Sequence, residues 1–488
     1  MLVYALIAVP LFAAALAFAI GSNRGRPWLL PAAGAAHLAL TAKLLAGPDA
    51  VDAGWLAPDD VGRVVLALMS VIFALTSVYA VGYLHARIER ANRVFCACLL
   101  VLLSMMTMFA AARHVGLMWV ALETCTLSSA PLIYFNHNPR SLEAVWKYLL
   151  VGSVGIALAL LGSLFLAYSA HREGLGGSLM LDDLVREAPQ LSRPWLHAAF
   201  VLLFIGYGTK MGLAPMHTWK PDAYGEAPGV AGAILAGAAT GCSFIAILRF
   251  FRICAAAGEA AFARQMMVTC GLFSMVVAAI FLVRQRDYKR MLAYSSVEHM
   301  GILVVGIGIG GGAVFGSLLH LVNNGISKGL VFLAAANIHR AYASRRTDEV
   351  RGAIRALPAS GALLLLGFFA ITGAPLLAPF VSEISIVYAA VEQGQIVTAA
   401  IFLAAMTVVY TGMGATVLEL VQGEPPPETV PKAEAPLTVA PIVVFAVLVV
   451  LLGVWVPRPL ESLLRQAAAS LEAPVPASVT ALAPRGHP

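Results

Sequence analysis

WLHAAFVLLFIGYGTKMGLAPMHTWKPDAYGEAPG, residues 195–229, begins as an apolar helix and is then interrupted. Lys210 ends the apolar run, Gly212 and Pro215 break it, and His217 follows the break. A lysine at the centre of a membrane helix costs about 2.5–3.5 kcal/mol, so other groups or water must offset that cost. The stretch therefore predicts a membrane helix that is broken at a polar site.

The composition of the chain is that of a membrane protein. Of its 488 residues, 60% are hydrophobic and 12% are charged, whereas soluble domains are about 25% charged. The net charge of +6 does not indicate a nucleic-acid partner, because the basic residues lie in short connections between apolar runs, where membrane topology explains them. The six cysteines lie in or beside apolar runs without a C-x-x-C pair, so the sequence predicts no metal and no cofactor.

Apolar runs of about twenty residues predict an all-α integral membrane protein with about fourteen transmembrane helices. The first three fall in residues 1–92. Two five-helix units are predicted over 93–251 and 266–421, and a last helix over 438–456. The Pro- and Ala-rich residues 457–488 are predicted to form a disordered tail.

A second predicted helix is broken as well. The stretch ITGAPLLAPFVSE (371–383) is interrupted by Gly373, Pro375 and Pro379 just before Glu383. This break takes the same place in the second five-helix unit as the break after Lys210 takes in the first. Because five is odd, the second unit would run inverted relative to the first. Paired broken helices in inverted repeats indicate a transport site near the middle of the membrane.

Polar side chains within the predicted helices are candidates for a proton pathway, because ionisable groups at membrane depth are costly and usually functional. His320, Asn324 and Lys328 are spaced four apart and line one face of the eleventh helix, whereas Glu123 and Lys210 would form a carboxylate–ammonium pair between two helices. For Lys147 and His217, near helix ends, snorkelling is an equal alternative, and His299 reads equally well as a core histidine. Glu298 has no assigned role beyond balancing Arg290 or Lys289. The candidates are Glu123, Lys147, Lys210, His217, His299, His320, Asn324, Lys328 and Glu383.

Six stretches, in this order, resemble the antiporter-like membrane subunits shared by respiratory NADH dehydrogenase, Mrp-type cation/proton antiporters and energy-converting hydrogenases. Hydrogenase-4 (formate hydrogenlyase) component F shows the strongest likeness. The stretches are WVALE (119–123), LEAVWKYLLVGSVGIALAL (142–160), KMGLAPMHTWKPDAYGEAPG (210–229), DYKRMLAYSSVEHMG (287–301), HLVNNGISKGLVFLAA (320–335) and GAPLLAPFVSE (373–383).

The resemblance implies two inverted five-helix repeats with broken helices 7 and 12. It also implies that Glu123, Lys210 and Glu383 are the acidic and basic residues of the proton path in helices 5, 7 and 12. Lys147 matches a lysine of helix 6, and His320 a histidine of helix 11. The eighth helix departs from the family pattern, because it lacks the mid-helix lysine or histidine and offers only Thr240, Cys242 and Ser243.

The implied function is proton translocation by a multi-pass subunit in a bacterial or archaeal inner membrane. The expected partners are other membrane subunits and a peripheral redox module of hydrogenase or dehydrogenase type, which would perform the electron transfer. One alternative is a Na⁺/H⁺ antiporter module, or an ion-coupled partner of inorganic-carbon uptake, so Na⁺ stays open as the transported ion. Another is a membrane scaffold that conducts no ions.

Overall fold

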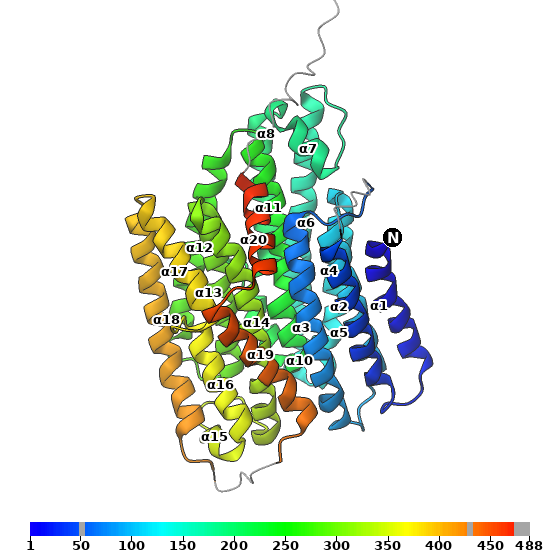
Figure 1. Cartoon of the computed structure of the whole chain (residues 1–488), viewed down its shortest axis with the longest axis vertical. Helices are drawn as coiled ribbons and strands as arrows, with labels where there is room; N and C mark the ends of the chain where they lie inside the picture. Colours follow the sequence, from blue (N-terminus) through cyan, green and yellow to red (C-terminus); the bar gives the residue numbers. More distant parts are fainter. Residues whose placement is uncertain (48–53, 427–432, 473–488) are drawn as a thin grey trace, which may run out of the picture.

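The computed structural model describes residues 1–47, 54–426 and 433–472, and its regular elements over these ranges are all helices (Figure 1). Twelve helical segments are long and apolar enough to cross a membrane. They comprise α1 (Leu2–Ala19), α2 (Leu29–Ala46), α3 (Asp60–His85), α4 (Arg93–Ala111), α5 (Val115–Ile133), α6 (Pro139–Arg172), α10 (Gly229–Ile234) continuing into α11 (Thr240–Ala256), α12 (Ala260–Leu282), α13 (Tyr288–Ile309), α14 (Gly312–Tyr342), α18 (Ile396–Gln422) and α19 (Pro436–Val454).

Two further helices are broken, as predicted. The first consists of α8 (Arg193–Met211) and α9 (Trp219–Glu226), and the second of α16 (Pro358–Ile371) and α17 (Ala378–Glu392). Together with the twelve continuous segments they confirm the expected all-α membrane fold with about fourteen helices. The remaining α-helices of the described residues are the short α7 (Leu181–Glu187) and α15 (Ala353–Ala356), and α20 (Arg458–Glu472) after the last span.

Glycine in a left-handed conformation ends the first half of each broken helix. Gly212 has φ +87° at the end of α8, and Gly373 has φ +70° just after α16, a backbone region that L side chains adopt only with strain. The backbone groups freed by the first break are bonded within the protein. Ser274 accepts from the N–H of Ala214 at 3.0 Å, and the indole of Trp219 donates to the carbonyl of Thr209 at 2.9 Å. Irregular backbone at membrane depth needs such partners.

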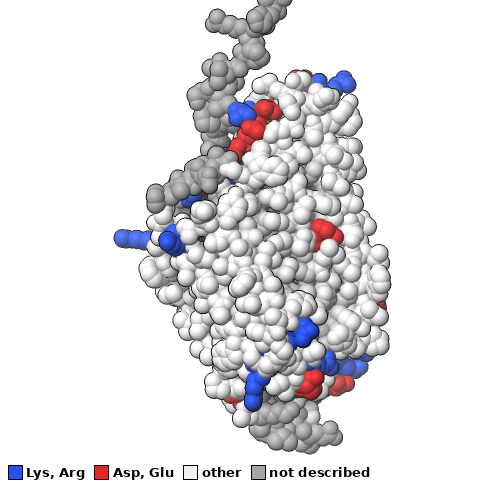
Figure 2. Space-filling view, turned by 90° about the vertical axis from the view of Figure 1, so that its right-hand side faces the viewer, with Lys and Arg blue, Asp and Glu red and all other residues white. Residues whose placement is uncertain are grey.

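Charged side chains are concentrated at the ends of the helix bundle. On the face shown in Figure 2 most of them lie toward the two ends, whereas an acidic group and some basic side chains lie at middle height and the rest of the surface between the ends is uncharged. Arginines from several connections meet around a cavity of about 660 Å³ at one end. Its charged lining consists of Arg87, Glu89, Arg90, Arg140, Glu226, Asp287, Lys289, Arg345, Arg346 and Glu349. This is the distribution that the positive-inside rule requires of one membrane side.

The predicted disordered tail from residue 457 is wrong for residues 458–472, which form α20 (Figure 1, red). Its buried side chains recur at helical spacing, so one face of the helix packs on the bundle although the overall composition is Pro- and Ala-rich. They are Leu464, Ala467, Ala468 and Leu471. The composition suggested disorder, but this periodicity decides the outcome. Residues 473–488 lie outside the described residues.

An ion pair fastens the beginning of α3 to α11. The Arg249 guanidinium, 4% exposed, donates to both carboxylate oxygens of Asp59 at 2.8 and 2.9 Å, and to the carbonyls of Phe109 and Ala110. Burial alone would raise the pKa of Asp59, but Arg249 and the backbone N–H of Gly62 hold that pKa below its usual value. Because the pKa is lowered, this stabilisation is present above the usual pKa of an aspartate and is lost as the pH falls through the lowered one.

Arg249→Met is expected to destabilise the protein by about 2 kcal/mol or more, because it removes charge-assisted hydrogen bonds and leaves carbonyls unpaired. Thermal unfolding in detergent measures the effect. Arg193→Met is the matched control, since Arg193 is 74% exposed and its pair with Glu259 should contribute about 0–1 kcal/mol. Equal unfolding temperatures for the two variants would contradict the assignment.

Candidate functional site

Lys210 lies in the last turn of α8 and is 7% exposed. Its ammonium donates a hydrogen bond to Oγ1 of Thr126 on α5 and lies 5.3 Å from the ring centroid of Tyr148 on α6. The ammonium also rests against Gly152 of α6, where an added Cβ would come within 2.6 Å of Nζ. Side chains and backbone from two neighbouring helices therefore fix the position of this charge.

A cavity of about 30 Å³ adjoins Lys210. A buried water needs roughly 10–15 Å³, so the cavity has room for about two water molecules. Thr240 and Ser243 of α11 line the cavity, just after a π-helical segment, Leu235–Ala239. Cys242 bonds elsewhere, with its Sγ 3.9 Å from the carbonyl of Met106. The eighth predicted helix, which is α10 and α11 in the structure, thus brings two hydroxyl groups to the cavity beside Lys210.

Glu123 lies on α5, one helical turn before Thr126, and is partly exposed. Its Oε2 atom is buried and has no hydrogen-bond partner among the described residues. Glu123 and Lys210 both belong to the described residues, and no ion pair within 4 Å joins them. The direct pair suggested by the sequence is therefore not formed, and the Thr126 hydroxyl takes the place of the carboxylate.

Lys147 and His217 do not join the Lys210 cluster. Lys147 is 45% exposed and bridges Glu143 at 2.6 Å and Asp222 of α9 at 2.8 Å, beside a surface cavity of about 320 Å³. His217 is buried in the break after α8, and its ring centroid lies 6.2 Å from that of Tyr294 on α13. Both residues face other parts of the bundle.

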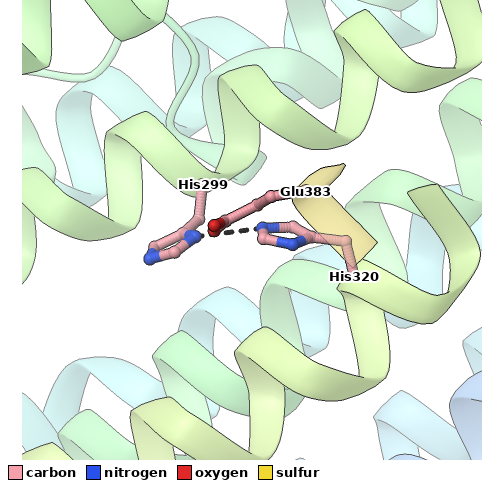
Figure 3. A group of neighbouring side chains, drawn as sticks. All are labelled: His299, His320 and Glu383. Atoms are coloured by element: carbon pink, nitrogen blue, oxygen red, sulfur yellow. Dashed lines mark hydrogen bonds between the residues drawn. The ribbon is translucent and has the colours of Figure 1, made fainter. Parts of the chain in front are cut away.

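His299, His320 and Glu383 come together from three helices, α13, α14 and α17 (Figure 3). Nδ1 of His299 lies 3.0 Å from Nε2 of His320. One ligand atom from each of the three residues lies within 4.8 Å of the others. Glu383 is 3% exposed, and neither of its oxygens has a hydrogen-bond partner within the described ranges. A carboxylate so placed needs a proton, water or a cation.

The polar face predicted for the eleventh helix, which is α14 in the structure, points into the protein. His320, Asn324 and Lys328 on α14 are at most 1% exposed. Lys328 donates from Nζ to the hydroxyl of Ser295 on α13 at 2.6 Å, and Asn324 Oδ1 is buried without a partner among described residues. The spacing of four therefore identified a continuous buried polar stripe.

Lys220 is a buried lysine that the sequence-based analysis did not include. It lies on α9 and is fully buried, and its Nζ donates to the carbonyl of Met211 at 2.8 Å and to that of Ser296 on α13 at 3.4 Å. Ser296 directly follows Ser295, the partner of Lys328. In the sequence, Lys220 stands in a polar stretch beside Asp222, which is typical of a loop, so only the fold reveals its burial.

Glu298 was also left without a role. It is 2% exposed on α13, and its Oε2 has no partner within the part of the chain that is described. The two suggested basic partners bond elsewhere, because Arg290 pairs with Asp222 at 2.8 Å and Lys289 donates to the carbonyl of Ala227 at 2.7 Å. Glu298 instead interacts electrostatically with Lys328.

Glu383 connects this interior to a second cavity. The cavity has a volume of about 260 Å³ and is lined by Thr372 and Gly373 in the break after α16 and by groups of α17 and α18, among them Glu383 and Tyr410. Gly373 leaves space for the carboxylate, since an added Cβ would lie 2.2 Å from Oε2 of Glu383. The buried polar groups thus run from the Lys210 cavity, past Lys220 and Lys328, to this opening.

The sequence is similar to proteins of a known membrane family. The family model described as NADH:quinone oxidoreductase/Mrp antiporter, TM, matches residues 112–409. The chain is 33% identical over 412 residues to a hydrogenase-4 component F homolog of Methylacidiphilum infernorum, covering 82% of this chain and 85% of the relative. It is 30% identical over 369 residues to NADH-quinone oxidoreductase subunit N of Desulforudis audaxviator, covering 73% and 72% of the two chains.

Solved structures have the same fold. A chain of the archaeal membrane-bound sulfane sulfur reductase superposes with a TM-score of 0.87 at 20% identity, covering 99% of each chain. A chain of the Mrp complex from Dietzia superposes with a TM-score of 0.85 at 19% identity, covering 98% of each. A chain of respiratory complex I from Thermus thermophilus gives 0.77 at 25% identity, covering 93% of this chain and 97% of that one. The chain therefore belongs to the NADH:quinone oxidoreductase/Mrp antiporter family of membrane proteins.

Proposed function

We propose that this protein is the proton-translocating subunit of a membrane-bound redox complex of the hydrogenase-4 or NADH dehydrogenase type. It would lie in a bacterial or archaeal inner membrane beside other membrane subunits and a peripheral redox module, which would perform the electron transfer. The main support is the row of buried lysines, histidines and carboxylates that crosses an otherwise apolar bundle. Each such group is costly at membrane depth unless it meets water, other charge or a transported ion.

The proposed route begins at Lys210 and its water-sized cavity and ends at Glu383. Trp219 lines the Lys210 cavity and is the neighbour of Lys220. Lys220 and Lys328 contact the adjacent residues Ser296 and Ser295 of α13. Lys220 would supply the ionisable group that α11, the eighth predicted helix, lacks. Protons would pass from Lys220 by way of Lys328 to Glu383.

Glu123 is the proposed point of coupling. This carboxylate lies one turn from Thr126 and its Oε2 has no hydrogen-bond partner among the described residues, so it would move toward or away from the Lys210 ammonium without breaking such a bond. Approach of the carboxylate favours the charged lysine, and its withdrawal favours release of the proton. A conformational or electrostatic change in a partner subunit would drive this exchange.

The test is redox-driven proton movement by the complex in proteoliposomes. Glu123→Ala is expected to lower proton movement by at least about ten-fold, which corresponds to about 1.4 kcal/mol in the barrier, while part of the electron transfer continues. Glu143→Ala is the control, since Glu143 is 65% exposed and pairs with Lys147 at the surface. Full proton movement by the Glu123 variant would contradict the coupling role. Vesicles without proton movement under any driving force would favour a scaffold.

A further inference from the structure

His299 and His320 face each other through one ring nitrogen each, Nδ1 of His299 and Nε2 of His320. These two are called the inner nitrogens here, and the hydrogen bonds of the other two, outer nitrogens leave each inner nitrogen with a lone pair. Nε2 of His299 lies 3.1 Å from the carbonyl of Ile371, which can only accept, so this nitrogen carries the proton. Nδ1 of His320 lies 3.0 Å from Oγ of Ser382, whose hydroxyl already donates to the carbonyl of Pro379 at 2.8 Å. These partners therefore assign the protons to the two outer nitrogens.

The inner nitrogens then face each other as two acceptors. They lie 3.0 Å apart, and two lone pairs at that distance repel unless a positive species lies between them. One added proton satisfies the pair. A metal ion satisfies it equally, because metal-bound histidines use an inner lone pair while the outer N–H donates to a carbonyl or hydroxyl group.

Glu383 supplies the third ligand and the charge. Its oxygens have no competing hydrogen bond among the described residues, so the carboxylate can move toward the histidines without losing one. Tetrahedral zinc with bonds of about 2.0–2.1 Å holds its ligands roughly 3.3 Å apart, close to the spacing of the two nitrogens. Lys328 can balance only one of the two carboxylates with which it interacts, Glu298 and Glu383.

We propose that His299, His320 and Glu383 bind one Zn²⁺ ion, and that the ion blocks proton transfer by occupying the place of the shared proton. Two nitrogens and one carboxylate are a ligand set typical of zinc, whereas Mg²⁺ and Ca²⁺ prefer oxygen ligands alone. The cavity of about 260 Å³ lined by Glu383 leaves room for a fourth ligand such as water. Binding releases the proton between the two rings. The blocking step rests on the proposed function, but the binding site does not.

Zinc binding to the full chain in nanodiscs tests the site, by competition with a coloured chelator. We expect one Zn²⁺ per chain, and loss of that site in His299→Gln, His320→Gln and Glu383→Gln. Ser382→Ala removes the partner of Nδ1 of His320, together with the acceptor of a 3.3 Å bond from the Asn323 amide, and it is expected to weaken zinc binding 10–100-fold. The absorption of bound Co²⁺ should indicate tetrahedral nitrogen and oxygen ligands. All variants are first compared by thermal unfolding.

His37→Gln is the matched control. His37 is also a fully buried histidine inside the bundle, but hydroxyls of Ser70 and Thr107 occupy both of its nitrogens. It should bind zinc as the unmodified chain does. Absence of bound zinc in the unmodified chain would overturn the site. Equal zinc binding by His37→Gln and by folded His299→Gln and His320→Gln would overturn it as well.

Inhibition is measured separately, in proteoliposomes that carry the complex. The zinc concentration that halves proton movement should rise in Ser382→Ala by the same factor as the dissociation constant. Zinc bound at the cluster without loss of proton movement would overturn the blocking step. A complex that binds zinc there but moves no protons when zinc-free would instead refute the proposed function and leave the metal site in place.

Discussion

Lys220→Arg is expected to lower redox-driven proton movement by about 100-fold or more while the protein stays folded. Arginine keeps the positive charge and the donors that reach the carbonyls of Met211 and Ser296, but it does not release its proton at physiological pH. A group that relays protons must both accept and release them, and such steps contribute about 10²–10⁴-fold. Proton movement in proteoliposomes and thermal unfolding are the two measurements.

A purely structural Lys220 would give the opposite pattern. The carbonyl of Met211 is one of the groups freed by the break after α8, so Lys220 also stabilises the end of that half-helix. If this were its whole role, Lys220→Met would unfold the protein more readily and Lys220→Arg would conduct normally. A conducting, well-folded Lys220→Arg variant would therefore remove Lys220 from the proton route.

Lys289→Arg provides the matched control. Lys289 is likewise buried, lies on α13 and donates to a backbone carbonyl, that of Ala227, at 2.7 Å. It lies at the arginine-rich end of the bundle and lines the cavity there. The expected result is nearly normal proton movement. Equal losses in the two arginine variants would indicate a general effect of replacing buried lysines.

The sequence predicted the parts of the fold that depend on short-range chemistry. The breaks after Lys210 and before Glu383 followed from glycine and proline within apolar runs, and the buried face of α14 followed from residues four apart. Each signal lies within one helix. Composition was the weaker guide, because it predicted disorder for residues 458–472, where the spacing of Leu464, Ala467 and Leu471 produces α20.

Contacts between helices could not be predicted in this way. The partner of Lys210 is Thr126, an ordinary threonine whose role depends on where the fold places α5 relative to the Lys210 side chain. The sequence does not reveal the burial of Lys220 and Glu298, because it offers charged partners for both, Asp222 near Lys220 and Arg290 two helical turns before Glu298. The fold directs those neighbours elsewhere, Asp222 to Lys147 and Arg290, and leaves Lys220 and Glu298 buried.

Lys210→Met is expected to reduce proton movement by about 100-fold or more with little loss of stability. Methionine fills nearly the same volume without a charge, so the variant avoids the cost of burying an ammonium group. The transport loss follows from removal of the ammonium group that shares the cavity with Thr240 and Ser243. Proton movement in proteoliposomes measures it, and normal movement would refute the route at its first step.

Gly152→Ala tests whether the position of that charge matters as well as its presence. The new methyl group would meet Nζ of Lys210, with the next nearest atom the adjacent Cε at 3.4 Å. The end of a flexible lysine can move aside, so stability should change little while the bond to Thr126 is lost. We expect about a ten-fold decrease in proton movement, whereas Ser153→Ala, at the exposed neighbouring position, should conduct normally. If Gly152→Ala conducted normally while Lys210→Met did not, the ammonium would be needed but its hydrogen bond to Thr126 would not.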